Sequence, residues 1–386
     1  MRLQNGFAPI LIVVGVLVIA AIGGAYYFSK QITPKSQTRD LIVASTPQPT
    51  SESSPNPSPT VKPTLKLSPS TSPTPTSTST PTSTSSRTNY SPKVLLLIYN
   101  PVLASQGNRK LVDYKNWKNP DTLTASIISD LKSSSHGIVN YAVVLRIELD
   151  GIPVKADGFE WSEVSYLTCI SGGECHNPDL ANYQAMISAV DACGKRNKGE
   201  IDELWIWGGP NFGYWESNLA GPNAFWYNSS PTVGTACQKL LPIMGFNYER
   251  GEAEALESYG HRVESTMKKV YGSWEVQYTH AWNKFALLDK DLPGKGGCGN
   301  AHSAVNGDGG YDRASTKVVS SSCEDFLNYP NLTGNTADIN CNAWGCSADG
   351  YLKWWYSHMP YFGGTGPDGK LNNWWPYIVD ADHTLF

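Results

Sequence analysis

The sequence of 386 residues lacks the short motifs that identify several common enzyme classes. It contains no G-x-S-x-G nucleophile elbow, no G-x-x-x-x-G-K-[ST] phosphate loop and no H-E-x-x-H zinc helix. Residues 1–92 also contain no Cys, His or Trp. All 8 Cys, 7 His and 13 Trp therefore lie in residues 93–386, and any catalytic chemistry is expected there.

Basic charge is scarce in the same part of the chain. The chain has 30 basic and 34 acidic residues, of which seven basic and two acidic residues lie in residues 1–92. Residues 93–386 therefore hold 23 basic and 32 acidic residues, a charge balance of -9. Binding to nucleic acid relies on a net basic surface that contacts phosphates. The composition therefore argues against nucleic acid as a main partner.

Charge is absent altogether from residues 3–29, which contain the apolar run Phe7–Phe28. A helix of this length spans about 33 Å, enough to cross a hydrocarbon core of about 30 Å. A cleaved signal peptide would have a shorter apolar stretch followed by small residues, whereas Tyr26, Tyr27 and Phe28 are bulky. We therefore predict a short tail over residues 1–6 and a transmembrane helix over residues 7–29, with the lipid bilayer as a partner.

Residues 30–92 are predicted to be a disordered linker, because 37 of the 48 residues from 45 to 92 are Ser, Thr or Pro. The basic residues Lys30, Lys35 and Arg39 alone would favour a cytoplasmic C-terminal part. Long downstream domains, however, are translocated largely regardless of charge. Together with the cysteine content, this predicts a single-pass protein of the cell membrane whose globular part is extracellular.

The cysteines are even in number and all lie in the predicted extracellular part, which indicates disulfides. Short loops could be closed by Cys169–Cys175 and by Cys341–Cys346, whereas the other pairings stay open. A rival zinc site at Cys169, Cys175 and His176 lacks the usual C-x₂₋₄-C pair. The eight candidates are Cys169, Cys175, Cys193, Cys237, Cys298, Cys323, Cys341 and Cys346.

From residue 93 onward, β-rich and helical stretches alternate. This alternation predicts an α/β domain over residues 93–386, with a mostly parallel sheet and flanking helices. Strands are expected at 94–99, 138–149, 201–207 and 240–246, and helices from 120, over about 179–193 and over 252–271, the last weakened at Gly260. After about residue 290, Gly, Asn, Asp, Cys and Trp dominate and predict a loop-rich, disulfide-tied part.

The ends of the predicted strands point to candidate site residues, because ligands of open parallel sheets bind beyond the carboxyl ends of the strands. Glu216 and Glu249 are the candidate acid and base for glycosidic cleavage, with Asn247 and His302 assisting. The alternative is that both carboxylates only cap a turn and a helix. Candidate substrate-binding residues are Asn100, Gly209, Tyr214, Trp215 and Arg250.

Two further patterns are weak candidates for a metal site. Glu254, Glu257, His261 and Glu264 share one face of the predicted helix over 252–271, where a solvated charged face is the alternative interpretation. Asn306, Asp308 and Asp312 loosely resemble a calcium loop, but the bidentate Glu of such a loop is missing. The sequence requires no cofactor, and calcium or zinc stays a minor hypothesis.

Several segments, among them DELWIWGGPNFGYWES, GFNYERGEAEALESYGHRVES and NNWWPYIVD, resemble an uncharacterised family of secreted or surface-anchored bacterial proteins. The resemblance covers nearly all of residues 93–386 and implies a common globular unit, but no activity. The high Trp content favours contacts with sugar rings. The leading hypothesis is a membrane-anchored protein that binds or hydrolyses polysaccharide or cell-wall glycan. The alternatives are a non-catalytic adhesin or cell-wall-binding module and a metal-dependent hydrolase using His261 or His302.

Overall fold

The computed structural model describes residues 88–385. The predicted tail and transmembrane helix (residues 1–29) lie outside these residues, as does the predicted linker up to residue 87. Within the described part, no helix is both long enough and apolar enough to cross a bilayer.

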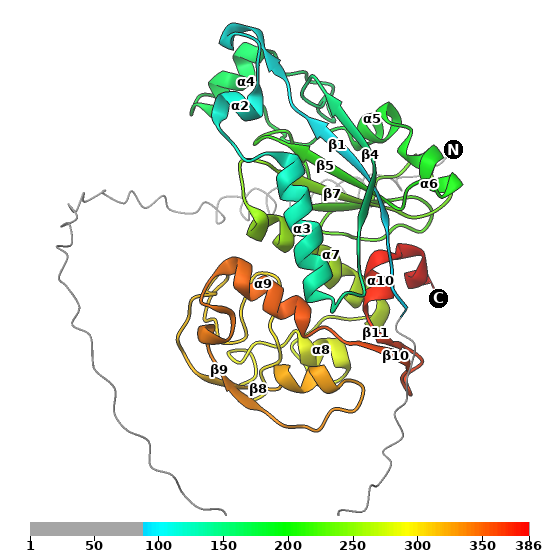
Figure 1. The fold of residues 1–386 in the computed structure, drawn as a ribbon, viewed down its shortest axis with the longest axis vertical. Coiled ribbons are helices and arrows are strands. Elements are labelled where there is room, and N and C mark those ends of the chain that lie inside the picture. Colours follow the sequence, from blue (N-terminus) through cyan, green and yellow to red (C-terminus); the bar gives the residue numbers. More distant parts are fainter. Residues whose placement is uncertain (1–87, 386) are drawn as a thin grey trace, which may run out of the picture. The chain divides into compact units, whose positions relative to one another are not determined.

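A five-stranded sheet lies at the centre of the described part (Figure 1). Its strand order is β4-β1-β5-β7-β6, formed by β1 (Lys93–Tyr99), β4 (Ala142–Leu149), β5 (Glu203–Gly208), β6 (Ser217–Ala220) and β7 (Leu241–Asn247). Strands β4, β1, β5 and β7 run parallel, and β6 is antiparallel to β7. The predicted α/β class with a mainly parallel sheet is confirmed, although β6 was not predicted.

Burial explains which stretches were easy to predict. All six residues of β5 and six of the seven in β1 are buried, so these strands read as continuous apolar runs. Strand β4 lies at the edge of the sheet and exposes several residues. Helix α3 (Pro120–Ser134) begins where predicted, because Asn119 accepts hydrogen bonds from the backbone N–H groups of Asp121 and Thr122.

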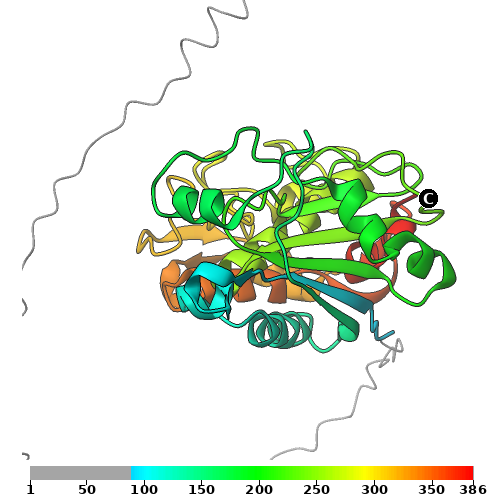
Figure 2. The ribbon, with the colours of Figure 1, turned by 90° about the horizontal axis from the view of Figure 1, so that it is seen from above.

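Helices flank both sides of the sheet (Figure 2). Helix α3 lies on one side together with α7 (Glu252–Tyr271), and α5 (Tyr183–Ala189) lies on the other. The prediction of one helix over 179–193 is wrong. Helix α5 is capped by Asn182 and begins only at Tyr183, and a separate helix α6 (Ala192–Lys198) follows Asp191.

Helix α7 continues without interruption through Gly260, contrary to the predicted weakening. The reason for the glycine is packing. A Cβ at Gly260 would lie 2.7 Å from the Cβ of Ala301, so only glycine lets the helix approach this loop so closely.

Residues after about 272 form the predicted loop-rich part, which packs beside α3 and α7 through α9 (Ala348–Ser357) (Figure 1). All eight cysteines form disulfides: Cys169–Cys175, Cys193–Cys237, Cys298–Cys323 and Cys341–Cys346. Both predicted short loops are confirmed, and the bonds fit an oxidising compartment.

The remaining short elements are β2 (Val102–Leu103), η1 (Ala104–Gln106), β3 (Arg109–Lys110), α2 (Leu111–Lys115), α4 (Glu163–Ile170), α8 (Ala281–Phe285), β8 (Val319–Ser321), η2 (Cys323–Asn328), β9 (Ala337–Ile339), η3 (Cys341–Trp344), β10 (Tyr361–Thr365), β11 (Leu371–Asn373), α10 (Trp375–Val379) and η4 (Ala381–Leu385).

Candidate functional site

A cavity of about 240 Å³ lies beyond the carboxyl ends of β5 and β7, beside the first turns of α7. This is where open parallel sheets place their ligands. The loop after β5 supplies Gly209 and Tyr214, and the residue preceding β6 is Glu216. Asn247 and Arg250 contribute from the end of β7 and the turn that follows it. These five residues, all selected from the sequence, line one cavity.

Three other candidates from the sequence lie elsewhere. Glu249 is exposed and does not line the cavity, so Glu216 and Glu249 do not form a pair across it. Asn100 is buried at the end of β1, where it donates to Glu148 and accepts from the backbone N–H of Val112. Trp215 is 45% exposed but is not part of the cavity wall.

The partner of Glu216 comes instead from α7. Glu257 lines the same cavity, and His261 and Glu264 follow it at helical spacings of four and three on the same face. The exposed fraction of each of these three residues is only 6–8%, so the predicted alternative of a solvated charged face is wrong for them and holds only for Glu254, which is exposed. Residues of this type are buried only when they are paired or hold an ion.

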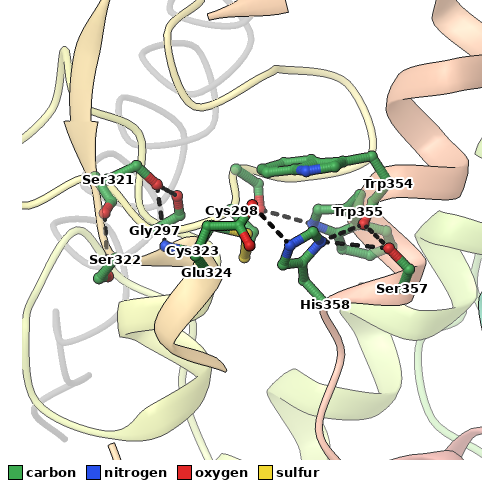
Figure 3. The surroundings of a disulfide bond; sticks show 12 residues. Gly297, Cys298, Ser321, Ser322, Cys323, Glu324, Trp354, Trp355, Ser357 and His358 are labelled. Atoms are coloured by element: carbon green, nitrogen blue, oxygen red, sulfur yellow. Dashed lines mark hydrogen bonds and ion pairs between the residues drawn. A yellow bond between two sulfur atoms is a disulfide. The ribbon is translucent and has the colours of Figure 1, made fainter. Parts of the chain in front are cut away.

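His302 reaches this face from the loop-rich part. Its loop is fixed by the Cys298–Cys323 disulfide, and Trp355 Nε1 donates to the carbonyl of Gly299 at 2.9 Å. Figure 3 shows this disulfide between Ser321 and Ser322 on one side and Trp354 and Trp355 of α9 on the other. The loop is thus held by a covalent bond and by α9, which keeps His302 beside α7.

Gly299 allows this loop to turn tightly. Its φ is +83°, and a Cβ there would lie 2.4 Å from the carbonyl oxygen of Ser303. The hydroxyl oxygen of Tyr351 lies 2.8–3.2 Å from the carbonyl oxygens of Cys298, Asn300 and Ser303 in the same turn, so its one proton is donated among these three acceptors. A residue with a side chain at Gly299 would force the turn open and displace His302.

Six charged or imidazole side chains meet at one end of the cavity, and we call them the Glu–His cluster: Glu216, Glu257, His261, Glu264, His302 and Arg313. Its centre is His261, whose Nε2 lies 3.4 Å from Glu216 Oε2 and 3.9 Å from Glu257 Oε1. His302 Nε2 lies 3.2 Å from the same Glu257 oxygen. The two imidazole rings are perpendicular, with centroids 4.4 Å apart.

A second layer of contacts orients these groups. Glu264 lies 2.9 Å from His261 Nδ1 and accepts a hydrogen bond from the backbone N–H of Ala301, so it links both histidine-bearing segments. Arg313 donates to Glu257 Oε2 at 2.8 Å, and Asn228 donates to Glu216. In the neutral tautomer that donates its Nδ1 proton to Glu264, His261 presents the lone pair of Nε2 to the centre of the cluster.

The cluster carries an excess of negative charge. Burial disfavours the charged imidazole of His261, but the hydrogen bond to Glu264 and the carboxylates of Glu264, Glu216 and Glu257 outweigh it and raise its pKa above the ordinary value. With both imidazoles neutral, three carboxylates and one guanidinium leave a net charge of -2. The arrangement therefore attracts positive charge, as a proton on His261 or as a divalent cation.

The geometry fits a metal ion. One ligand atom each from Glu257, His261 and His302 lies within 4.8 Å of the others. Ligand atoms of a tetrahedral site with bonds of about 2.0–2.1 Å are about 3.4 Å apart, so small side-chain shifts suffice. Two histidines and one carboxylate, with a second carboxylate behind one histidine, are a donor set typical of zinc and related divalent metals.

The other metal-site candidates from the sequence do not form a cluster of ligands. Asp308 is exposed and pairs with Lys317 Nζ at 2.8 Å, and Asp312 accepts only from the backbone N–H of Asp308. The Nδ2 atom of Asn306 donates to two backbone carbonyls. Cys169 and Cys175 are bonded to each other, and His176 pairs with Asp157, which excludes the rival zinc site there.

Comparisons of the chain with protein-family models, with curated proteins and with solved structures gave no match.

The sequence placed Glu257 and His261 on one helix face but did not bring Glu216 or His302 to them. It missed Arg313 and Asn228 entirely. The missing information was the contact between α7 and the loop around Ala301, because the sequence alone does not show which cysteine Cys298 bonds to. The spacing of Glu257, His261 and Glu264 was the one signal that pointed to the cluster.

Proposed function

We propose that residues 88–385 form a metal-dependent hydrolase of an extracellular glycan, anchored to the cell membrane by residues 7–29. The observation that carries this proposal is the convergence of Glu257, His261 and His302 at one end of the cavity, with Glu264 orienting His261. The disulfides support an oxidising compartment. The apolar run and the Ser/Thr/Pro-rich linker support the anchor and the stalk.

Each residue of the cluster has a distinct role in this proposal. Glu257, His261 and His302 hold the cation, and Arg313 fixes the orientation of Glu257. When bound, a divalent cation acidifies a water and polarises the bond to be cleaved. Glu216 lines the cavity with 40% of its side chain exposed, and its carboxylate would serve as general base for a water in the cavity.

The substrate lies in the cavity between Glu216 and Arg250. Gly209 and Tyr214 line this cavity together with Asn247 and Arg250, whose side chains carry N–H donors. Glu249, outside this cavity, has no part in the reaction. In this respect the proposal departs from the pair of carboxylates that the sequence favoured.

The proposal is tested by metal content, which requires no knowledge of the substrate. We expect the full-length protein, equilibrated with zinc and dialysed, to retain about one metal ion per chain in elemental analysis. His302→Ala should lower the affinity for zinc at least tenfold, because one of three ligands is lost. Glu264→Gln should lower it by about 10–100-fold, because an outer partner of a ligand histidine is lost.

His383 offers a matched control. Its side chain is 45% exposed, as is that of His302, and it also faces a carboxylate, that of Asp380. His383→Ala should therefore leave zinc binding unchanged. Equal metal content in the wild-type protein, His302→Ala and His383→Ala would reject the proposal. A metal-free protein that loses hydrolysis on Glu257→Gln would favour acid–base catalysis by Glu216 and Glu257.

A further inference from the structure

The face of α7 that carries the Glu–His cluster continues into a second groove. After Glu257 and His261, the spacings of three and four lead to Ser265, Lys268 and Gly272. The last three of these residues line a groove of about 380 Å³ together with Phe225, Trp226 and Lys269. We call this the Trp226 groove.

The Trp226 groove has the features of a binding surface. The side chain of Trp226 is 57% exposed, although most tryptophans of the described part are buried. Lys268 and Lys269 are both exposed, and neither forms an ion pair with another described residue. Lys269 Nζ lies 5.6 Å from the centroid of the Phe225 ring. Tryptophan is enriched at interaction sites relative to the rest of the protein surface.

The charge of the groove points to an anionic ligand. Two unpaired lysines stand together on a part of the chain whose charge balance is -9. A local positive patch on an acidic molecule attracts a negatively charged partner to that place, whereas the acidic surface around it does not. The indole of Trp226 adds a flat face whose edge can hydrogen-bond, which suits a sugar ring.

A short loop, residues 226–228, connects the groove with the Glu–His cluster. Asn228, two residues after Trp226, donates to the carboxylate of Glu216. Between them, Tyr227 is fully buried, and its hydroxyl accepts from Thr266 of α7. Along α7, Lys268 is seven residues from His261, about 10 Å at the rise of an α-helix. One extended chain can therefore contact both places.

We propose that the Trp226 groove binds an acidic sugar unit of a polysaccharide, with Trp226 stacked on the ring and Lys268 and Lys269 paired with its carboxylate. The role of the groove as a substrate subsite rests on the proposed function, but the binding itself does not. The carboxylated sugars are spaced along the polysaccharide so that, when one of them occupies the Trp226 groove, the bond to be hydrolysed lies at the Glu–His cluster.

The experiment measures binding of a hexamer of galacturonic acid to full-length protein by calorimetry, without metal, so that no turnover occurs. The fully methyl-esterified hexamer is the uncharged control. We expect the acid to bind at least tenfold more tightly than the ester, with an affinity that falls as salt is added. Trp226→Ala and the double variant Lys268→Gln/Lys269→Gln should each lower the affinity at least tenfold.

The control variant Lys132→Gln/Lys290→Gln removes the same charge from exposed positions outside the groove and should leave binding unchanged. Equal losses in both double variants, equal binding of acid and ester, or no binding of the acid would overturn the proposal. Tighter binding of poly(glycerol phosphate) through the same lysines would overturn the choice of a carboxylated sugar. His302→Ala should bind the hexamer normally, so a failure of the metal site is distinguishable from a failure of the groove.

Discussion

Helix α7 carries two buried charge clusters whose main residues, His261 and Arg262, are adjacent in the sequence and face in different directions. His261 belongs to the Glu–His cluster at the cavity. Arg262 belongs to a second cluster under the sheet, which we call the Glu203–Arg262 cluster and which includes Tyr141, Trp205 and Tyr259. The Glu203–Arg262 cluster serves the fold, whereas the Glu–His cluster has the properties of a site.

The Glu203–Arg262 cluster is closed and balanced. Arg262 donates to both oxygens of Glu203, at 2.6 and 2.7 Å, and both residues have no exposed surface. Tyr141 and Trp205 donate to the same carboxylate, each at 2.9 Å. One positive charge meets one negative charge, and neither residue lines the cavity beside the Glu–His cluster or the Trp226 groove. Such a pair specifies how α7 lies on the sheet.

The Glu–His cluster is neither closed nor balanced in charge. It opens onto a cavity through Glu216 and Glu257, and its carboxylates outnumber its guanidinium by two when the imidazoles are neutral. An excess of buried negative charge costs stability unless a cation compensates it. We conclude that residue types alone do not identify a site on this helix, whereas unbalanced charge beside a cavity does.

The largest expected effect comes from breaking the balanced cluster. Glu203→Gln leaves the guanidinium of Arg262 buried without a counter-charge. Breaking a buried ion pair in this way costs about 3–5 kcal/mol. We expect this loss in the free energy of unfolding, measured by urea denaturation of the metal-free full-length protein.

Glu216→Gln is the matched change in the unbalanced cluster. It removes one surplus carboxylate from a group that is 40% exposed, so the loss should be below about 1 kcal/mol, within the range of surface substitutions. Equal losses for Glu203→Gln and Glu216→Gln would mean that the two clusters do not differ in charge balance.

The next effect concerns the covalent support of the Glu–His cluster. Cys298 and Cys323 are 25 residues apart, and removing the bond with Cys298→Ser/Cys323→Ser frees the unfolded chain, at a cost of about 3 kcal/mol. The same change releases the loop of His302, so zinc affinity should fall together with stability. Urea denaturation and zinc titration measure the two effects.

Cys341→Ser/Cys346→Ser is the control, because this bond closes a separation of only five residues and does not hold His302. The smaller loop predicts a smaller loss, about 2 kcal/mol, with zinc affinity unchanged. A loss of zinc affinity in the control that matches the first variant would show that general loosening, not the position of His302, controls the site.

The elements that the sequence predicted well are those that local patterns determine. Helix α7 begins at Glu252 and ends at Tyr271 as predicted, because its capping residues and its amphipathic spacing are local. Strands β1 and β5 were recognisable as apolar runs. Strand β6 was missed, because its four buried residues, Ser217–Ala220, are mostly polar or small and gain their place only by pairing with β7.

The candidate site was only partly predictable for the same reason. The rule of strand ends selected five residues that line the cavity, because sheet topology follows from the alternation of elements. The contact of His261 with His302 could not be predicted, since it depends on a disulfide and on Gly260 packing against Ala301. Glu249 was selected as a base because it follows a predicted strand, a position that can be inferred from the sequence. The cavity, which Glu257 lines and Glu249 does not, could not be inferred from the sequence.

The smallest expected effect comes from Gly260, which stands between Tyr259 of the Glu203–Arg262 cluster and His261 of the Glu–His cluster. In Gly260→Ala, the higher helix propensity of alanine stabilises α7 by about 1 kcal/mol. The new methyl group overlaps the Cβ of Ala301, 2.7 Å away, and such overpacking costs about 1–3 kcal/mol. We expect a net loss of about 1 kcal/mol in urea denaturation.

Zinc titration of the same variant distinguishes the two faces of the helix. The loop of Ala301 and His302 must move away from α7, so zinc affinity should fall several-fold, while the Glu203–Arg262 cluster on the other face is undisturbed. Ala301→Gly in the Gly260→Ala background removes the overlapping methyl group and should restore zinc affinity. If affinity is unchanged in Gly260→Ala, or is not restored in the double variant, the close approach of α7 to this loop does not position His302.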